Sequence, residues 1–163
     1  MCKMINKRLF YIFIFFAFMQ CKDPFLVMDR RYTMFLKNNS AYNLRYYIAF
    51  GNYGPKISLA YPDTSISDII PYDEIINAGK DYVIYESSVK LKDVYEDLPG
   101  DTLSIYLFHA DTLAKYSIDE IREDYKVLQR YDLSLEDLEH LDYKLSYPPD
   151  AKMSGVKMYP PYP

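Results

Sequence analysis

Two segments with alternating side chains constrain the fold of this chain most strongly. From Asn43 to Phe50 a largely apolar set that begins at Leu44 alternates with a more polar set, so each set lies on one face of a strand. From Thr102 to His109 the residues also alternate, but both sets are largely apolar, which is typical of a strand covered on both faces. A period of two over such lengths predicts a sheet with a buried core.

Shorter β-rich segments occur along the rest of the chain, and turn residues separate them. These segments are Tyr32–Lys37, Ile75–Ile76, Tyr82–Tyr85, Val127–Leu133 and Tyr143–Tyr147. The turn cluster Asn38-Asn39-Ser40 separates the first of them from the strand at Asn43, so we expect these two strands to pair as an antiparallel hairpin. Gly79 is expected to supply a positive φ, and Pro148-Pro149 ends the last strand.

Helical signals are short and lie between the strands. Ser117 and Glu120 have the spacing of a capping box, and Ser134 to Asp137 opens another helical turn. Residues 88–98 can hold one or two further turns. The sequence therefore predicts a mainly β fold with short helices, an α+β arrangement in which one antiparallel β-sandwich-like domain forms the core.

Four regions follow from this pattern. Residues 1–20 form an apolar leader with basic residues in front, and residues 21–31 are short and mixed, as expected of a tether. Residues 32–149 form the β-rich globular domain, in which residues 51–77 are a loop-rich excursion with Gly and Pro. Residues 150–163 form a proline-rich tail without a fold of its own, either extended, docked or mobile.

The first 22 residues have the organisation of an export signal. Lys3, Lys7 and Arg8 precede an unbroken apolar run over residues 9–19. That run is about 11 residues, roughly 16 Å as a helix, whereas a membrane span takes about 20 apolar residues. The run is therefore too short for a permanent span.

Cys21 follows the apolar run, and here the chain resembles a bacterial lipoprotein precursor. The resemblance implies cleavage before Cys21, which becomes the lipidated first residue of the mature protein and attaches it to a membrane. Lys22-Asp23 resembles the short signal that directs lipoproteins of Bacteroidota to the outer face of the outer membrane. The alternative is a secreted protein in which Cys21 is an incidental thiol.

Two later stretches strengthen the resemblance. Residues 125–149 and Tyr61-Pro62-Asp63-Thr64 are similar to an uncharacterised family of Bacteroidota lipoproteins. That similarity implies a shared fold and an envelope location, and no activity comes with it.

Charge and cysteine content exclude several classes of function. Removal of Lys3, Lys7 and Arg8 with the leader takes the formal charge from −4 to −7, which argues against a nucleic-acid partner. Cys2 would leave with the leader and Cys21 would carry lipid, so no disulfide is expected. The stability of the domain must then come from its core.

Tyrosine is unusually frequent, with 19 residues in a chain that has no Trp. Many of these tyrosines are in phase with strand alternation and suit a sheet. Some lie beside Gly or Pro, where we expect exposed side chains that could contact a glycan or a partner protein. The candidate contact residues are Tyr53, Tyr61, Tyr72 and Tyr159.

The sequence contains only weak candidates for a catalytic or metal-binding site. His109 and Asp111 could face one side as an acid/base pair, and His140 with Glu136 has the helical spacing of two metal ligands. An edge histidine near a turn aspartate and a solvated acidic helix end are the simpler interpretations. A carboxylate cluster over residues 119–124 is interpreted as surface charge, because glycoside hydrolysis needs two carboxylates separated across a cleft. We therefore expect no catalytic residues, no metal and no cofactor.

The sequence thus predicts a lipid-anchored envelope protein that acts as a binding or interaction module, with an envelope protein or a glycan as partner. Two alternatives stay open. One is a small envelope hydrolase that uses His109, Asp111 or the acidic cluster. The other is a structural accessory subunit of an outer-membrane complex.

Overall fold

The structure is a computed structural model that describes residues 31–49 and 74–163. The predicted leader, most of the tether and most of the loop-rich excursion lie outside the described residues. The same is true of Phe50, the last residue of the second predicted strand.

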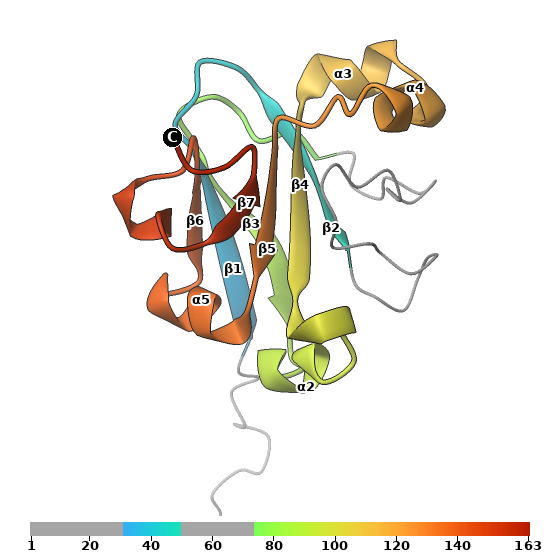
Figure 1. Cartoon of the computed structure of the whole chain (residues 1–163). Helices are drawn as coiled ribbons and strands as arrows, with labels where there is room; N and C mark the ends of the chain where they lie inside the picture. The colour runs from blue at the N-terminus through green and yellow to red at the C-terminus, as the bar shows by residue number, and fades with distance from the viewer. Residues whose placement is uncertain (1–30, 50–73) are drawn as a thin grey trace, which may run out of the picture. The chain divides into compact units, whose positions relative to one another are not determined.

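Within the described residues, seven strands form two sheets (Figure 1). The three-stranded sheet has the order β3-β1-β6, and the four-stranded sheet has the order β2-β4-β5-β7. The bounds of the strands are β1 (Tyr32–Asn38), β2 (Leu44–Ala49), β3 (Asp81–Ser87), β4 (Leu103–His109), β5 (Gln129–Leu133), β6 (Lys144–Tyr147) and β7 (Lys157–Tyr159). Every pair is antiparallel except β1 and β6, which run parallel. The predicted mainly β, α+β fold is confirmed.

The core is built from the inward faces of both sheets, as the alternation in the sequence predicts. Met34 and Leu36 of β1 share one buried cluster with Leu44 of β2 and Ile105 of β4. The opposite face of β4 is buried as well, because Tyr106 and its neighbours belong to a second, smaller cluster. Both faces of β4 are therefore covered, as predicted for this strand.

The predicted hairpin between β1 and β2 is wrong. β1 pairs with β3 and β6, whereas β2 pairs with β4 in the other sheet. The buried side chain of Asn38 explains this: its amide donates to the carbonyls of Tyr42 and Ile76, and its oxygen accepts from the N–H of Ser40. These bonds hold the chain in a corner that carries it from one sheet to the other.

A single turn separates the predicted strand at Ile76 from β3. Gly79 has the expected positive φ of 72°. Ile76 does not pair with β3, however, and forms an isolated bridge with Leu44 of β2 instead. The chain from Ile76 to β3 therefore connects the two sheets. Ile76 bridges to β2 of the four-stranded sheet, and β3 belongs to the three-stranded sheet.

Short helices and 3₁₀ turns connect the strands. They are α2 (Leu91–Tyr95), η2 (Pro99–Asp101), α3 (Ala110–Lys115), α4 (Ile118–Glu123), α5 (Leu135–His140) and η3 (Ala151–Met153). The capping box at Ser117 and Glu120 is present, and Ser134 forms a second one with Asp137. In both, the hydroxyl of the serine accepts from a backbone N–H, while the carboxylate three residues on accepts from the N–H of the serine.

The proline-rich tail belongs to the folded domain, so the domain extends beyond residue 149. β7 pairs with β5, and Met158 is buried in the main core together with Val156 and Met153. The amide of Gln129 donates to the carbonyl of Pro160 at 2.7 Å. Three apolar residues spaced among the polar and proline residues explain why this segment folds onto the sheet.

Several tyrosines are structural, in agreement with their strand phase. Tyr131 and Tyr95 are buried, and their hydroxyls donate to the carbonyls of Ser146 (2.8 Å) and Leu133 (3.0 Å). Burial raises the pKa of both phenols above the usual value for tyrosine. Each must therefore stay protonated in the folded state.

This burial predicts a loss of stability at alkaline pH. Above pH 10 the two phenols ionise in the unfolded chain but not in the folded one, so the folded state holds more protons and its stability falls as pH rises. The expected slope is about 1.4 kcal/mol per pH unit for each tyrosine. Urea unfolding between pH 9 and 12 should show a shallower fall for Tyr131→Phe than for the wild type. Equal slopes would contradict the prediction.

Candidate functional site

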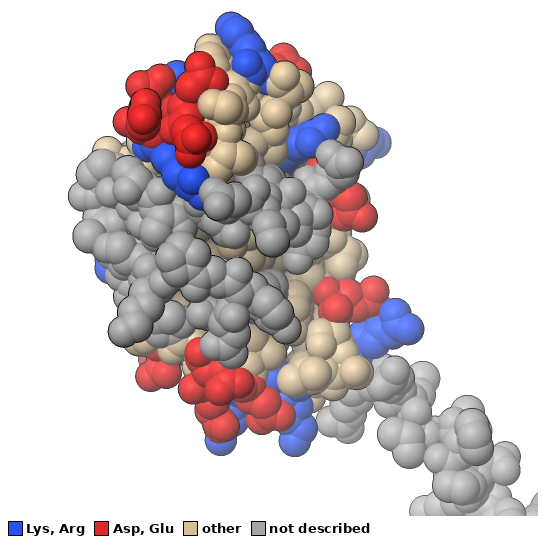
Figure 2. All heavy atoms as spheres, turned by 90° about the vertical axis from the view of Figure 1, so that its right-hand side faces the viewer, with Lys and Arg blue, Asp and Glu red and all other residues tan. Residues whose placement is uncertain are grey.

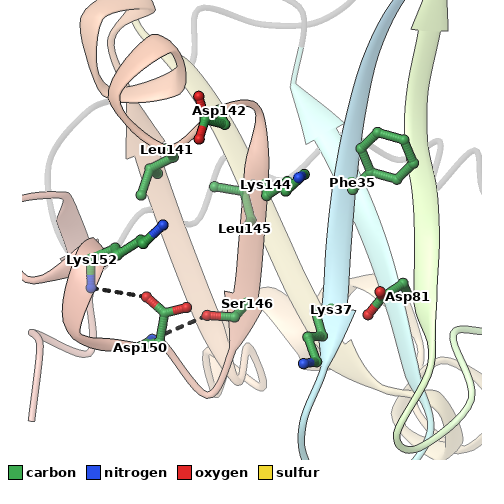
Figure 3. A pocket seen from close by; sticks show the side chains of 10 residues that line it. All are labelled: Phe35, Lys37, Asp81, Leu141, Asp142, Lys144, Leu145, Ser146, Asp150 and Lys152. Atoms are coloured by element: carbon green, nitrogen blue, oxygen red, sulfur yellow. Dashed lines mark hydrogen bonds between the residues drawn. The ribbon is translucent and has the colours of Figure 1, made fainter.

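A cavity of about 400 Å³ opens on the three-stranded sheet (Figure 3). We name it the Phe35 cavity. Its lining combines apolar side chains with three lysines and three aspartates, and consists of Phe35, Lys37, Asp81, Leu141, Asp142, Lys144, Leu145, Ser146, Asp150 and Lys152. The cavity thus offers apolar surface together with charges of both signs.

Strand register brings the central residues of the cavity together. Met34 and Leu36 point into the core, so Phe35 and Lys37 point out, and Phe35 is 37% exposed. In the parallel pair of β1 and β6, Phe35 is level with Lys144. In Figure 3 the ammonium group of Lys144 points toward the Phe35 ring. A long-range pairing therefore forms a site from residues that are far apart in the sequence.

The wall beyond β6 is held by the turn that leads into η3. The hydroxyl of Ser146 accepts from the N–H of Asp150 at 3.1 Å, and the carboxylate of Asp150 accepts from the N–H of Lys152 at 2.9 Å. Figure 3 shows these bonds, with the Lys152 side chain directed toward Leu141. The turn is thereby fixed, whereas the ammonium group of Lys152 takes no part in these bonds.

The lysines of the cavity are available to a ligand. None of Lys37, Lys144 and Lys152 forms an ion pair in the part of the chain that the structure describes. Their charges are partly balanced by three nearby aspartates, so the cavity does not select a simple anion. Among the lining residues there is no His or Cys, and the single hydroxyl, on Ser146, is already a hydrogen-bond acceptor. This chemistry suits binding.

The predicted contact tyrosines do not line this cavity. Tyr53, Tyr61 and Tyr72 lie outside the described residues. Tyr159 is half-buried on β7 of the other sheet, where its ring meets Tyr125 edge-on at a centroid distance of 5.3 Å. Tyr159 is less exposed than its position beside a proline predicts, because β7 holds its ring against that of Tyr125.

His109 acts as a helix cap. Its Nδ1 accepts the N–H of Asp111 at 3.2 Å and so caps α3, while the carboxylate of Asp111 lies 3.8 Å from the same nitrogen. This nitrogen is thus engaged by the backbone N–H at the start of α3. The ring also packs against that of Tyr42, tilted by 30°, at a centroid distance of 4.9 Å. Both residues lie outside the Phe35 cavity, so the geometry favours the capping interpretation over an acid/base pair.

The other polar candidates lie on exposed helix surfaces. His140 and Glu136 are exposed on α5, and within residues 31–49 and 74–163 no group of three or more His, Cys, Asp or Glu is arranged to hold a metal ion. The carboxylates over residues 119–124 are exposed and engage local partners, since Asp119 pairs with Arg122 and Asp124 with Lys126. Figure 2 shows acidic side chains at the top of the molecule, where α4 lies in Figure 1.

A buried charge cluster lies on the four-stranded sheet. The guanidinium of Arg130 donates to both carboxylate oxygens of Asp132, at 2.7 and 3.2 Å, and neither side chain is exposed. The hydroxyl of Ser104 donates to the same carboxylate at 2.7 Å, and Tyr106 lies under the guanidinium at 5.3 Å. Their burial separates these groups from solvent, so the cluster is a structural feature.

Sequence reasoning missed the lysines of the cavity. The outward position of Lys37 could be inferred from the alternation in β1, but nothing local links it to Lys144 or Lys152.

No family model, curated protein or solved structure matches this chain. Among the described residues, no helix has the length and apolar character needed to cross a membrane.

Proposed function

We propose that this chain is a lipid-anchored binding module of the bacterial envelope, attached to the outer membrane through Cys21. The leader, which resembles that of a bacterial lipoprotein precursor, supports the envelope location. At least two acyl chains are needed for stable attachment to a bilayer, which lipidation of a lipoprotein amino terminus would supply. The binding role is carried by a different observation, the Phe35 cavity.

The chemistry of the cavity favours a peptide segment of an envelope protein over a neutral glycan. An exposed aromatic ring can stack on either, but a neutral sugar has no charge to match three lysines and three aspartates. A peptide that carries both charges and an apolar side chain complements every part of the lining. Electrostatic complementarity of this kind contributes mainly specificity.

The same observations rank the alternatives. The capping geometry of His109 does not support the hydrolase. An accessory-subunit role is compatible with a peptide ligand, because a stable partner would then be a subunit of the same complex.

The test is co-purification of the full-length chain from envelopes extracted with a mild uncharged detergent. Wild type and Lys144→Glu should both be in the membrane fraction, but the charge reversal should reduce the retained partner about tenfold, equivalent to about 1.4 kcal/mol. Lys92→Glu on α2 is the matched control, because Lys92 is exposed outside the cavity. Cys21→Ala should move the protein to the soluble fraction.

Two results would overturn the proposal separately. Cys21→Ala that stays in the membrane fraction would remove the lipid anchor. Undiminished partner recovery with Lys144→Glu would remove the Phe35 cavity as the binding site.

A further inference from the structure

The outer edge of β3 is more open than the outer edge of β6, the other edge strand of the same sheet. β3 is seven residues long and pairs with β1 on one side, and no described strand pairs with its other side. By contrast, the edge of β6 is sealed: the N–H of Ser146 contacts the sulfur of Met153, and the carbonyl of Ser146 accepts from Tyr131. β2 is bridged by Ile76 at its first residue.

An unpaired strand edge presents backbone donors and acceptors to any extended chain that reaches it. Natural domains usually shorten or cover such edges. The features of β3 that blunt this edge are the register shift opposite Met34 and Phe35, which marks a bulge, and the charged side chains of Asp81 and Glu86. On the outward face Val83 is 40% exposed, beside the equally exposed Phe35. The edge is therefore long, accessible and partly apolar.

A groove of about 650 Å³ runs along this edge, and we name it the Tyr46 groove. It is lined by the length of β3 together with one residue of β2 and one residue from the segment before Ile76. The lining residues are Tyr46, Glu74, Asp81, Tyr82, Val83, Ile84, Tyr85 and Glu86. A strand-like ligand could thus contact backbone on one side and aromatic rings on the other.

The charge of the groove is of one sign. Three carboxylates line it, and none of its described lining residues is Lys or Arg. Glu86 is paired with Arg31 at 3.0 Å, but Glu74 and Asp81 form no ion pair within the described part of the chain. Within the described part of the chain, Glu74 is therefore a carboxylate of the groove without an ion-pair partner, whereas Asp81 also borders the lysines of the Phe35 cavity.

Glu74 is held in place within the groove. The hydroxyl of Tyr46 donates to its carboxylate at 3.4 Å. The ring of Tyr82 lies beside that of Tyr46, at a centroid distance of 6.3 Å, and Glu74 raises the pKa of the Tyr82 phenol. The bond from Tyr46 orients the Glu74 carboxylate, which makes it a more defined anchor for a cation than a freely rotating surface side chain.

We propose that β3 binds an extended, lysine- or arginine-bearing segment of a partner protein, which adds to the three-stranded sheet as a fourth strand with a cation at Glu74. Backbone hydrogen bonds would provide affinity, and the alternate side chains of the ligand would provide specificity. A second copy of this chain is disfavoured as the occupant, because two facing grooves would bring together six carboxylates. This surface is distinct from the Phe35 cavity, although Asp81 borders both.

The probe is a fluorescein-labelled eight-residue peptide in which valine alternates with lysine or arginine. Its dissociation constant is measured by anisotropy on the full-length chain in uncharged micelles, with empty micelles as blank. Glu74→Gln should weaken binding about threefold, the range expected for one exposed ion pair. Glu139→Gln, on the exposed surface of α5, should leave binding unchanged. Circular dichroism checks that both variants fold.

Backbone pairing is tested from the ligand side, which leaves the protein intact. Alternate N–H groups of an added strand face the sheet and the solvent in turn. N-methylation of one alternate set should therefore abolish binding, and N-methylation of the other set should leave it within about twofold of the parent peptide.

Any of three results would overturn the proposal: equal affinity for both methylated peptides, equal affinity for a peptide with glutamate in place of its cations, or no saturable binding of the parent peptide. Because the readout does not involve Lys144, failure here is distinguishable from failure of the Phe35 cavity.

Discussion

Replacement of Asp132 by alanine is expected to lower the free energy of unfolding by about 3–5 kcal/mol. The reason is the complete burial of Arg130, which donates to both oxygens of this carboxylate. Without the carboxylate, a guanidinium that cannot be deprotonated would be left inside the domain next to Ser104 and Tyr106. A buried charge that loses its counter-ion has a large desolvation penalty.

Urea unfolding of the single variant and of the double variant Arg130→Met/Asp132→Leu measures this effect. The double variant removes both charges and should recover most of the lost stability, because buried ion pairs contribute little relative to apolar residues of similar volume. A double variant as unstable as Asp132→Ala would show that the cluster matters for more than its charge balance. A single variant within about 1 kcal/mol of the wild type would contradict the burial argument.

Deletion of residues 156–163 is expected to lower the free energy of unfolding by about 4 kcal/mol or more, since loss of one buried methionine alone costs about 2–5 kcal/mol. The deletion removes β7, and with it the buried side chains of Val156 and Met158. It also uncovers β5 beside Asp132, because Asp132 pairs with Lys157 in the ladder. The loss should therefore exceed that of the Met158→Ala variant.

A chain that ends at Pro160 is the matched control. It keeps β7 and the bond from Gln129 to Pro160, and it loses only three exposed residues. Its stability should stay within about 0.5 kcal/mol of the wild type. If the variant that lacks residues 156–163 were as stable as the chain that ends at Pro160, the assignment of the tail to the core would be contradicted.

Local signals in the sequence located β1 to β6 and the starts of α4 and α5, but not α3 or β7. Alternation located β2 and β4, and the spacing of Ser117 and Glu120 located the start of α4. The interpretation of Val127–Leu133 as a strand was right, although β5 begins two residues later. These features depend on neighbours within a few residues, which one sequence contains in full.

Pairing depends on residues far apart, and there the sequence was insufficient. A turn signal after β1 suggested a hairpin, because nothing local indicates that the side chain of Asn38 bonds the carbonyl of Ile76. The prolines of the tail indicate a segment without a fold of its own, whereas Met153 and Met158 pack it into the main core. The Phe35 cavity could not be predicted for the same reason, since β1, β6 and η3 meet only in the folded domain.

The parallel pairing of β1 with β6 has a consequence for when the domain can form. β1 lacks one neighbour until Lys144–Tyr147 has been synthesised, and β5 lacks one until Lys157–Tyr159 has followed. Each sheet therefore contains a pairing between strands that are far apart in the sequence, and contacts across such long loops form slowly. Completion of both sheets is therefore expected to follow the formation of the local helices and turns.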